Sequence, residues 1–338
     1  MDQRYKRFED ASRDVGIILE NLETGIGEHG VSVLVQDPSK PIRIHLPTDV
    51  LLPTEIVDYE ANKVKDDAQV SPKMREYWNS YLELTLSDAA VEARKQLEEV
   101  IKKEKLLEWA KANRIIALNN FLRISGSDGA VRRLLSAARA FAHQTLGSVH
   151  IPYLDFVNHG YPALNYKPTV EGISLEGKSP GPEVLVTYNA RDSLSLLDTY
   201  TFFSPSIFSY VIPSVFTPED GITYKVHDRV EERVLVEGKG MVPIVSKQGN
   251  EINMSFSLLG IKSAPRLAVE SFNLAIAQAK GLTRAERQTF SDLRHPMVRL
   301  SLQAYWTIYR RAEQIKDENL RSLLLKASAD VIKTGTAR

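Results

Sequence analysis

Residues 151–160 read Ile-Pro-Tyr-Leu-Asp-Phe-Val-Asn-His-Gly, and residues 184–189 read Val-Leu-Val-Thr-Tyr-Asn. Each stretch is an apolar run that ends in polar side chains, Asn158 and His159 in the first and Tyr188 in the second. The turn-rich residues 161–183 connect the two. Two such segments can bring polar side chains to one place, so we take this pair as the centre of a candidate functional site.

The composition narrows the kind of protein. With 338 residues, the chain is long enough for two domains, or for one domain with a helical appendage. Its 43 Lys and Arg residues balance 43 Asp and Glu residues, so no global field favours nucleic acid or an anionic membrane as a partner. No stretch approaches the roughly 18 apolar residues of a membrane span, and the first residues lack the apolar run of a secretion signal. We therefore expect a soluble, cytoplasmic protein.

The residues available also exclude several chemistries. The chain has no cysteine, which excludes disulfides, thiolate zinc sites and a cysteine nucleophile. The two central stretches carry no acidic pair beside a second metal ligand, and no Gly-x-Ser-x-Gly occurs, so we expect neither a metal site nor a serine hydrolase. What remains is a site of tyrosine hydroxyls, an amide and backbone oxygens. Such a site can position and desolvate a substrate, but it has no strong nucleophile.

The N-terminal part of the chain carries both helix and strand patterns. A helix is predicted within residues 1–24, and it includes the apolar run 15–19. Two strands, 31–35 and 42–47, are predicted on either side of a turn at 37–41. The sequence therefore predicts an N-terminal helix followed by a strand pair.

A helical block follows. Ser71, with proline after it, is typical of a helix start, and the charged, leucine-rich pattern continues to about Leu122. Its charges, with Glu98 paired to Lys102 at i,i+4, are expected to form a solvated face. A glycine-rich break comes next, and a further helix is predicted over residues 130–145.

The C-terminal part changes from strands to helices. Residues 222–258 show period-two alternation and turn signals, which predict a small hairpin-rich unit. The first C-terminal helix is expected to end at Gly281, and Thr283 begins the second with a capping box. Apolar stripes at 302–312 and 320–331 predict a third and a fourth helix.

These segments resemble the SET-domain methyltransferases. The pair Asn158-His159 is similar to their Asn-His motif, and residues 188–202 resemble the Tyr-Gly, Asn, Glu-Leu-Leu and Tyr-Gly-Phe succession that closes the domain. Residues 138–141, Ala-Arg-Ala-Phe, resemble the family's Ser-Arg-x-Phe step. Because the chain has no cysteine for a zinc cluster and has helical patterns at its end, the resemblance is to the branch of the Rubisco large-subunit methyltransferases, which carries a helical insert.

The resemblance implies an α+β fold. We expect a SET-like β-rich domain of short sheets, with a helical insert and a mainly helical C-terminal region. The expected parts are residues 1–70 with the N-terminal helix and opening hairpins, 71–145 with the helical insert and connecting helix, 146–220 with the closing motifs, and 221–338 with the hairpin-rich segment and the C-terminal helices.

The resemblance also implies a function. The cofactor would be S-adenosyl-L-methionine, and the reaction would be methyl transfer to an amine, first of all a lysine side chain of a protein substrate. The residues implied in catalysis are Tyr188, at the point of transfer, and Tyr200. Those implied in cofactor binding are Gly25, Gly27, Glu28, Asn158, His159 and Tyr188. Those implied in substrate binding are Arg139, Asp155 and Tyr166.

The chemistry of the residues agrees with this reaction but does not require it. A sulfonium already activates its methyl group, so the protein needs mainly to align the amine, carbon and sulfur and to favour the neutral amine. Tyrosine oxygens suit this task, and an aromatic channel lowers the pKa of a lysine. Without the resemblance, Tyr188 is typical of a core residue at a strand end, Asn158 and His159 of a capped turn, and Gly25 and Gly27 of a hairpin.

Several positions depart from the family pattern. Ala138 replaces its serine, Asn189 and Thr201 replace two of its glycines, and Asp192-Ser193 stands where the family has Ser-Asn. These departures leave open two other functions. One is an enzyme that methylates a small amine or an amino acid. The other is a catalytically inactive SET-like protein that binds a partner.

Overall fold

The structure is a computed structural model, and it describes residues 3–27, 30–187, 191–237 and 240–337. The chain divides into two units. The first contains residues 1–99 and 124–188, and the second contains residues 100–123 and 189–338. Both units combine helices with short sheets, which confirms the predicted α+β class. No helix in the described part of the chain is long and apolar enough to cross a membrane.

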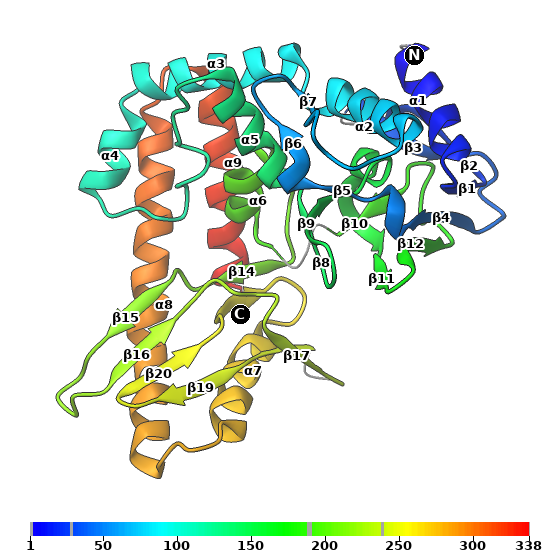
Figure 1. Ribbon diagram of the computed structural model, residues 1–338. Helices are drawn as coiled ribbons and strands as arrows, with labels where there is room; N and C mark the ends of the chain where they lie inside the picture. The colour runs from blue at the N-terminus through cyan, green and yellow to red at the C-terminus, as the bar shows by residue number, and fades with distance from the viewer. Residues whose placement is uncertain (1–2, 28–29, 188–190, 238–239, 338) are drawn as a thin grey trace. The chain divides into compact units, whose positions relative to one another are not determined.

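The first unit holds most of the short strands (Figure 1). Its helices are α1 (Gln3–Asp14), α2 (Pro72–Thr85), α3 (Asp88–Lys103), which crosses the boundary between the units, and α5 (Asp128–Arg139), with 3-10 turns η1 (Thr48–Val50), η2 (Thr54–Ile56) and η3 (Leu154–Phe156). Its strands are β1 (Ile18–Glu20), β2 (Leu22–Gly27), β3 (Gly30–Val35), β4 (Ile42–Pro47), β5 (Leu52–Pro53), β6 (Val57–Asp58), β7 (Lys63–Val64), β8 (Phe141–His143), β9 (Gly147–His150), β10 (Asn158–Leu164), β11 (Lys167–Thr169), β12 (Gly172–Gly177) and β13 (Leu185–Val186).

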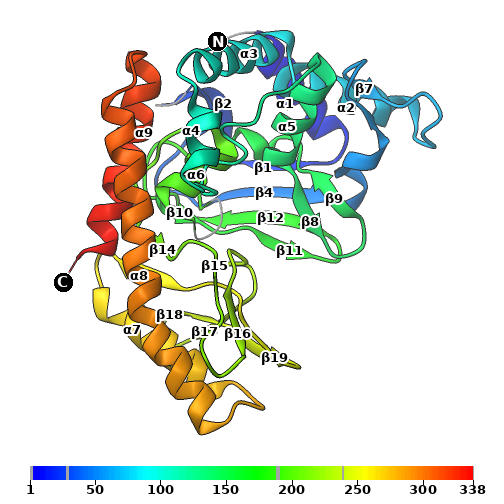
Figure 2. The same cartoon turned by 90° about the vertical axis from the view of Figure 1, so that its left-hand side faces the viewer.

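A four-stranded sheet with the order β1-β4-β12-β11 is the largest in the first unit (Figure 2). Every neighbouring pair in it is antiparallel, and β4 pairs with β12 over six residues. Ile42, Ile44 and Leu46 alternate on one face of β4 and are almost completely buried, as period-two patterning requires of a half-buried strand. Smaller sheets surround it: β2-β3, β5-β9-β8, β6-β7 and the parallel pair β10-β13.

The helix α2 closes the core of this unit. Ser71 caps it as predicted, because the Ser71 hydroxyl accepts the backbone N–H of Met74 and proline occupies the first turn. Its buried face includes Tyr77, which stacks on Phe8 of α1 with ring centroids 5.1 Å apart. This aromatic pair joins the two helices and extends the hydrophobic core beneath the sheets.

Two of the expectations for the N-terminal segment were wrong. The first helix ends at Asp14, and Gly16 takes a φ of +95°, so the apolar run continues as β1 and not as helix. The strands β3 and β4 do not pair with each other: β3 pairs with β2, and β4 pairs with β1 and β12. The turn between β3 and β4 is held by Asn21, whose Nδ2 donates to the backbone oxygens of Asp37, Lys40 and Pro41. This turn leads the chain from the β2-β3 hairpin into the sheet that contains β4.

The helical insert also differs in detail from the prediction. Glu98 is buried and not part of a solvated face, because its carboxylate accepts Arg94 Nε at 3.2 Å and the backbone N–H of Ser125 at 2.9 Å. The helix predicted over 130–145 ends at Arg139. The following residues form β8, which pairs with β9, and the His143 imidazole accepts hydrogen bonds within the hairpin turn. Tertiary pairing therefore overrides the helical pattern there.

The second unit combines small sheets with long helices (Figure 1). Its helices are α4 (Leu106–Ala112), α6 (Ser193–Tyr200), α7 (Pro265–Gln278), α8 (Arg284–Glu313) and α9 (Glu318–Gly335). Its strands are β14 (Phe208–Tyr210), β15 (Ser214–Phe216), β16 (Thr223–Val226), β17 (Arg233–Val236), β18 (Gly240–Pro243), β19 (Val245–Gln248), β20 (Glu251–Met254) and β21 (Leu258–Ile261). They confirm the predicted hairpin-rich segment, with sheets β15-β16-β20-β19, β17-β18 and β14-β21.

The C-terminal helices confirm the capping prediction and correct the count. Thr283 and Glu286 form the predicted capping box, with both reciprocal hydrogen bonds present. The second and third predicted helices are one helix, α8, which continues through Pro296. Packing of α8 along α9 offsets the backbone hydrogen bond that proline cannot donate. The described residues after 262 therefore contain three helices and not four.

Candidate functional site

The strand pair β10-β13 brings the two decisive stretches together. The strands are parallel, with Asn158 opposite Leu185 and His159 opposite Val186. Gly160 permits this close approach, because a Cβ there would lie 2.7 Å from Leu185 Cδ1. The Asn-His pair therefore lies beside the strand that leads to Tyr188. Tyr188 itself, and Asn189 after it, fall outside the described residues.

The segment before β13 also joins the N-terminal hairpin. Val35 donates its backbone N–H to Pro182 at 2.8 Å, and Val184 donates to Val33 at 2.8 Å. Residues 182–184 thus form an isolated antiparallel bridge to β3, with Glu183 opposite Leu34, and the chain then passes to its pairing with β10. The glycine-containing hairpin and the Asn-His strand meet at this junction.

Glu183 lies at the junction, and it was not predicted from the sequence. Its Oε1 accepts the hydroxyl of Ser32 at 2.5 Å and the amide Nδ2 of Asn158 at 2.8 Å. The same carboxylate lies against Gly27, where a Cβ would be 2.6 Å from it. One acidic group therefore contacts β2, β3 and β10. Two of the residues that it contacts, Gly27 and Asn158, are implied in cofactor binding.

The glycines of the hairpin have different surroundings. The space that a side chain would take at Gly25 is filled by Leu34 of the neighbouring strand, whereas at Gly27 it is filled by the Glu183 carboxylate. Gly27 pairs with Gly30, whose φ of +106° suits glycine. Glu28, in the turn between them, lies outside the described residues. Gly25 thus serves packing within the hairpin, and Gly27 faces the junction.

His159 is buried and neutral at physiological pH. Burial lowers the pKa of its imidazole to about 4, and a hydrogen bond to the backbone of Val186 acts in the opposite direction without reversing the shift. Only 6% of its surface is exposed. A neutral imidazole at this position can contact an uncharged ring or an N–H group without adding charge to the site.

Asp155 and Arg139 belong to a second polar cluster, which Tyr81 completes. The turn η3 carries Asp155, and it begins after Tyr153, a buried residue with φ 71° and ψ −49°, a conformation that non-glycine residues rarely adopt. The phenol of Tyr81 donates a hydrogen bond to Asp155 Oδ2. Burial raises the pKa of the Asp155 carboxyl to about 6, although the positive charge of Arg139 and the Tyr81 hydrogen bond both oppose that rise.

A buried histidine extends this cluster. His150 is fully buried, and its Nε2 lies 3.0 Å from the hydroxyl of Ser136, which in turn lies 2.7 Å from the phenol of Tyr59. Burial, helped by the nearby charge of Arg139, lowers the pKa of His150 to about 4. Its ring centroid is 5.6 Å from that of Tyr81. A neutral histidine therefore lies against both Ser136 of α5 and the ring of Tyr81.

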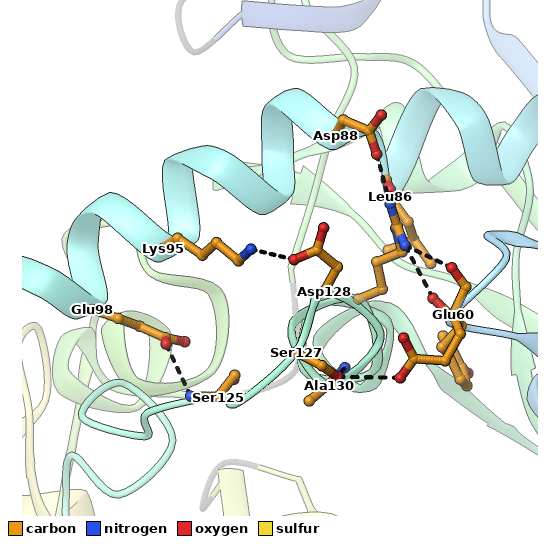
Figure 3. Close-up of polar contacts among 11 residues, drawn as sticks. Glu60, Leu86, Asp88, Lys95, Glu98, Ser125, Ser127, Asp128 and Ala130 are labelled. Atoms are coloured by element: carbon orange, nitrogen blue, oxygen red, sulfur yellow. Dashed lines mark hydrogen bonds and ion pairs between the residues drawn. The ribbon is translucent and has the colours of Figure 1, made fainter.

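The start of α5, the helix that ends at Arg139, is held by charged groups (Figure 3). Ser127 caps the helix by accepting the N–H of Ala130, and its hydroxyl donates to Glu60. Lys95 of α3 forms an ion pair with Asp128 in the first turn. These contacts fix the axis of the helix and hence the position of its last residue.

Arg132, one turn further along α5, adds a buried anchor. Its guanidinium donates to the backbone oxygens of Leu86, Tyr59 and Glu60 and to the carboxylate of Asp88. Figure 3 shows the acceptor residues Leu86, Asp88 and Glu60 grouped beside the helix. One side chain thus ties α5 to the end of α2, the start of α3 and the segment after β6.

The remaining predicted residues lie in two places. Tyr166 packs edge-on against Phe141, two residues after Arg139, with ring centroids 6.4 Å apart. Tyr200 lies in the second unit as the last residue of α6, and its ring is 5.9 Å from that of Phe202. Thr201 follows with a φ of 61°, a conformation that favours glycine, the residue that the SET motif has there.

Other kinds of site find little support in the described part of the chain. No group of three or more acidic or histidine side chains within it is arranged to hold a metal ion. A cavity of about 510 Å³ opens beside α5, and Thr54, Tyr59, Arg133, Ser136 and Ser148 are among its lining residues. None of the residues predicted for the site lines it. The candidate site is therefore the junction around Glu183 together with the cluster around Asp155.

No family model matches the sequence, and no curated protein matches it. Several solved structures are similar to the chain over nearly its whole length. The SET domain of LSMT bound to lysine and AdoHcy is 12% identical, with a TM-score of 0.42, and the match covers 99% of this chain and 90% of that one. The same domain bound to methyllysine and AdoHcy is 12% identical, with a TM-score of 0.44 and coverage of 98% and 89%. Rubisco LSMT bound to sinefungin and monomethyllysine is 13% identical, with a TM-score of 0.41 and coverage of 99% and 90%.

Proposed function

We propose that the chain is an S-adenosyl-L-methionine-dependent N-methyltransferase of the SET type, with a lysine side chain of a protein as the methyl acceptor. Asn158, His159 and the face of the hairpin at Gly27 would hold the cofactor. Tyr188 would lie at the point of transfer, and Asp155 with Arg139 at the acceptor end.

The register of β10 and β13 is the observation that carries this proposal. His159 pairs with Val186, and Tyr188 follows Val186 by two residues in the sequence. A methyltransferase of this kind needs its cofactor-binding amide and its phenol close together, since the donor and the acceptor must meet in one place. If β10 and β13 had not been neighbours, Asn158 and Tyr188 could not share one site, and the proposal would have failed.

The junction fits a positively charged cofactor with an amino-acid portion. The carboxylate of Glu183 lies beside Gly27, the amide of Asn158 donates to it and so turns its own carbonyl oxygen to the other side, and His159 is neutral. S-adenosyl-L-methionine would supply a methyl group whose bond to the cationic sulfur breaks, with the electron pair going to sulfur, as the amine nitrogen attacks. The chain itself would align the groups and exclude water.

The acceptor end would contribute a carboxylate with a raised pKa. Above about pH 6 Asp155 is ionised, and it can accept an N–H from an incoming amine. The Tyr81 phenol, which donates to Asp155 Oδ2, holds this carboxyl in place. The buried, aromatic surroundings would lower the pKa of a lysine, whereas the ionised Asp155 carboxylate would raise it, so the role of Asp155 here would be to position the amine.

Replacement of the phenol tests the assignment. Tyr188→Phe is expected to lower kcat by about 100-fold, by analogy with the loss of one positioned oxygen in other enzymes, and to leave the affinity for S-adenosyl-L-methionine within about twofold. Tyr309→Phe, which makes the same change on α8, is the control and should keep full turnover. Equal turnover in the wild type and Tyr188→Phe would remove Tyr188 from the reaction.

Incubation with methyl-labelled donor and cell extract identifies the acceptor. Label in protein bands supports the lysine acceptor, and label in small molecules supports methylation of a small amine or an amino acid. If calorimetry shows cofactor binding but no label is transferred, the chain is a catalytically inactive binding protein. If S-adenosyl-L-methionine does not bind at all, the proposed function is wrong.

A further inference from the structure

The contact between Glu183 and Asn158 determines which way the Asn158 amide faces. A carboxylate only accepts hydrogen bonds, so the side of the amide that faces Glu183 must be the NH₂ group. The carbonyl oxygen of Asn158 must therefore face the opposite side. With a neutral, two-sided partner such as glutamine, the amide could take either orientation.

Glu183 is itself held in one position. Ser32, which has no exposed surface, donates to the same Oε1 at 2.5 Å, and Gly27 leaves room for the carboxylate because a side chain there would collide with it. The backbone on both sides of Glu183 is also fixed, by the hydrogen bonds of residues 182 and 184 to β3. The orientation of the amide is thus imposed by a carboxylate that has little freedom to move.

We propose that Glu183 is a specificity-determining positioning residue: it turns the Asn158 carbonyl toward the cofactor, so that the site selects a ligand with an ammonium group in its amino-acid portion. A carbonyl oxygen and a nearby negative charge both favour an ammonium over a neutral group or a carboxylate. The inference rests on the proposed function, because it assumes that Asn158 contacts the cofactor.

Two ligands that differ in the amino-acid portion distinguish this role from a merely structural one. S-adenosylhomocysteine carries the ammonium group, and 5′-methylthioadenosine lacks the whole amino-acid portion. Titration calorimetry with the full chain measures both affinities. Glu183→Gln is expected to weaken the affinity for S-adenosylhomocysteine by about 10- to 100-fold, the effect of one charge-assisted hydrogen bond. It should change the affinity for 5′-methylthioadenosine by less than about twofold.

Two further variants serve as controls. Glu176→Gln removes an exposed carboxylate from β12, where it pairs with Arg43, and should change neither affinity. Ser32→Ala keeps the charge of Glu183 but removes one of its donors. It should therefore shift the same ligand preference in the same direction by a smaller factor, and it tests the proposal even if Glu183→Gln does not fold.

The outcomes separate the two hypotheses. An equal loss of affinity for both ligands in Glu183→Gln, or no loss for either, overturns the role of Glu183 and leaves the proposed function intact. If the wild-type chain binds neither ligand, the proposed function fails, and the inference about Glu183 fails with it.

Discussion

Replacement of Arg132 by methionine should be one of the most damaging single changes in the first unit. The Arg132 side chain is 8% exposed, and its guanidinium donates to three backbone carbonyls and one carboxylate. Methionine can occupy a similar volume, but it has no N–H group to give these acceptors. The perturbation therefore removes hydrogen bonds without opening a large cavity.

The contacts set the magnitude. The side chain of Asp88 is 93% exposed, so water replaces that partner at little cost. The three carbonyls, bonded at 3.1 to 3.3 Å, lose charge-assisted hydrogen bonds that contribute about 1.5–3 kcal/mol each. Because these bonds are long and water can enter from the exposed side, we expect a total loss of about 3–4 kcal/mol. For a unit of this size, the loss corresponds to a decrease in Tm of about 6–16 °C.

Differential scanning calorimetry measures the loss, and hydrogen exchange of the α5 amides assigns it to the first unit. Arg133→Met is the matched control, because it makes the same change at the next position, where the exposed side chain lies over the ring of Tyr59, 5.5 Å from its centroid, in a cation–π geometry. We expect that variant to lose less than about 1 kcal/mol. If both variants lower Tm by the same amount, the buried guanidinium is not an anchor, and the reasoning is refuted.

Two other changes follow from the backbone and from a buried carboxyl. Thr201→Gly should raise the unfolding free energy of the second unit by about 1 kcal/mol in a denaturant titration, because Thr201 has a φ of 61°. Thr336→Gly, at a helix end with φ −103°, is the control and should bring no gain. Equal effects of the two changes would show that Thr201 is not strained. The pKa of Asp155 rises from 3.8 to about 6 on folding, so the folded state resists ionisation, and this penalty appears as pH rises from about 4 to about 6. The wild type should lose up to about 3 kcal/mol relative to Asp155→Asn over that window in urea unfolding, and parallel pH profiles would show that the carboxyl is not perturbed.

Local patterns predicted the features that depend on a few neighbouring residues. Ser71 and the capping box of Thr283 and Glu286 form as expected, because a cap needs only residues within one turn. The nearness of Asn158 to the strand before Tyr188 was also predicted, from two apolar runs that end in polar residues. The α+β class followed from the mixture of periodicities.

Features that depend on distant residues gave no such signal. Glu183 acquires its role from Ser32, 151 residues away, and Tyr81 acquires its role from Asp155, 74 residues away. Glu98 looked like part of a solvated face, but it is buried against Arg94 and accepts the N–H of Ser125, 27 residues away. In each case the partner is brought into range by tertiary packing, which no local period encodes.

The bridge that residues 182–184 form with β3 of the N-terminal hairpin has a consequence for synthesis. The hairpin leaves the ribosome early, but the backbone groups of Val33 and Val35 gain their partners only after residue 184 has been made. Until then, one edge of β3 stays unpaired and open to other chains, a state that favours aggregation. A nascent or truncated chain that stops before Pro182 would therefore leave this edge of β3 exposed.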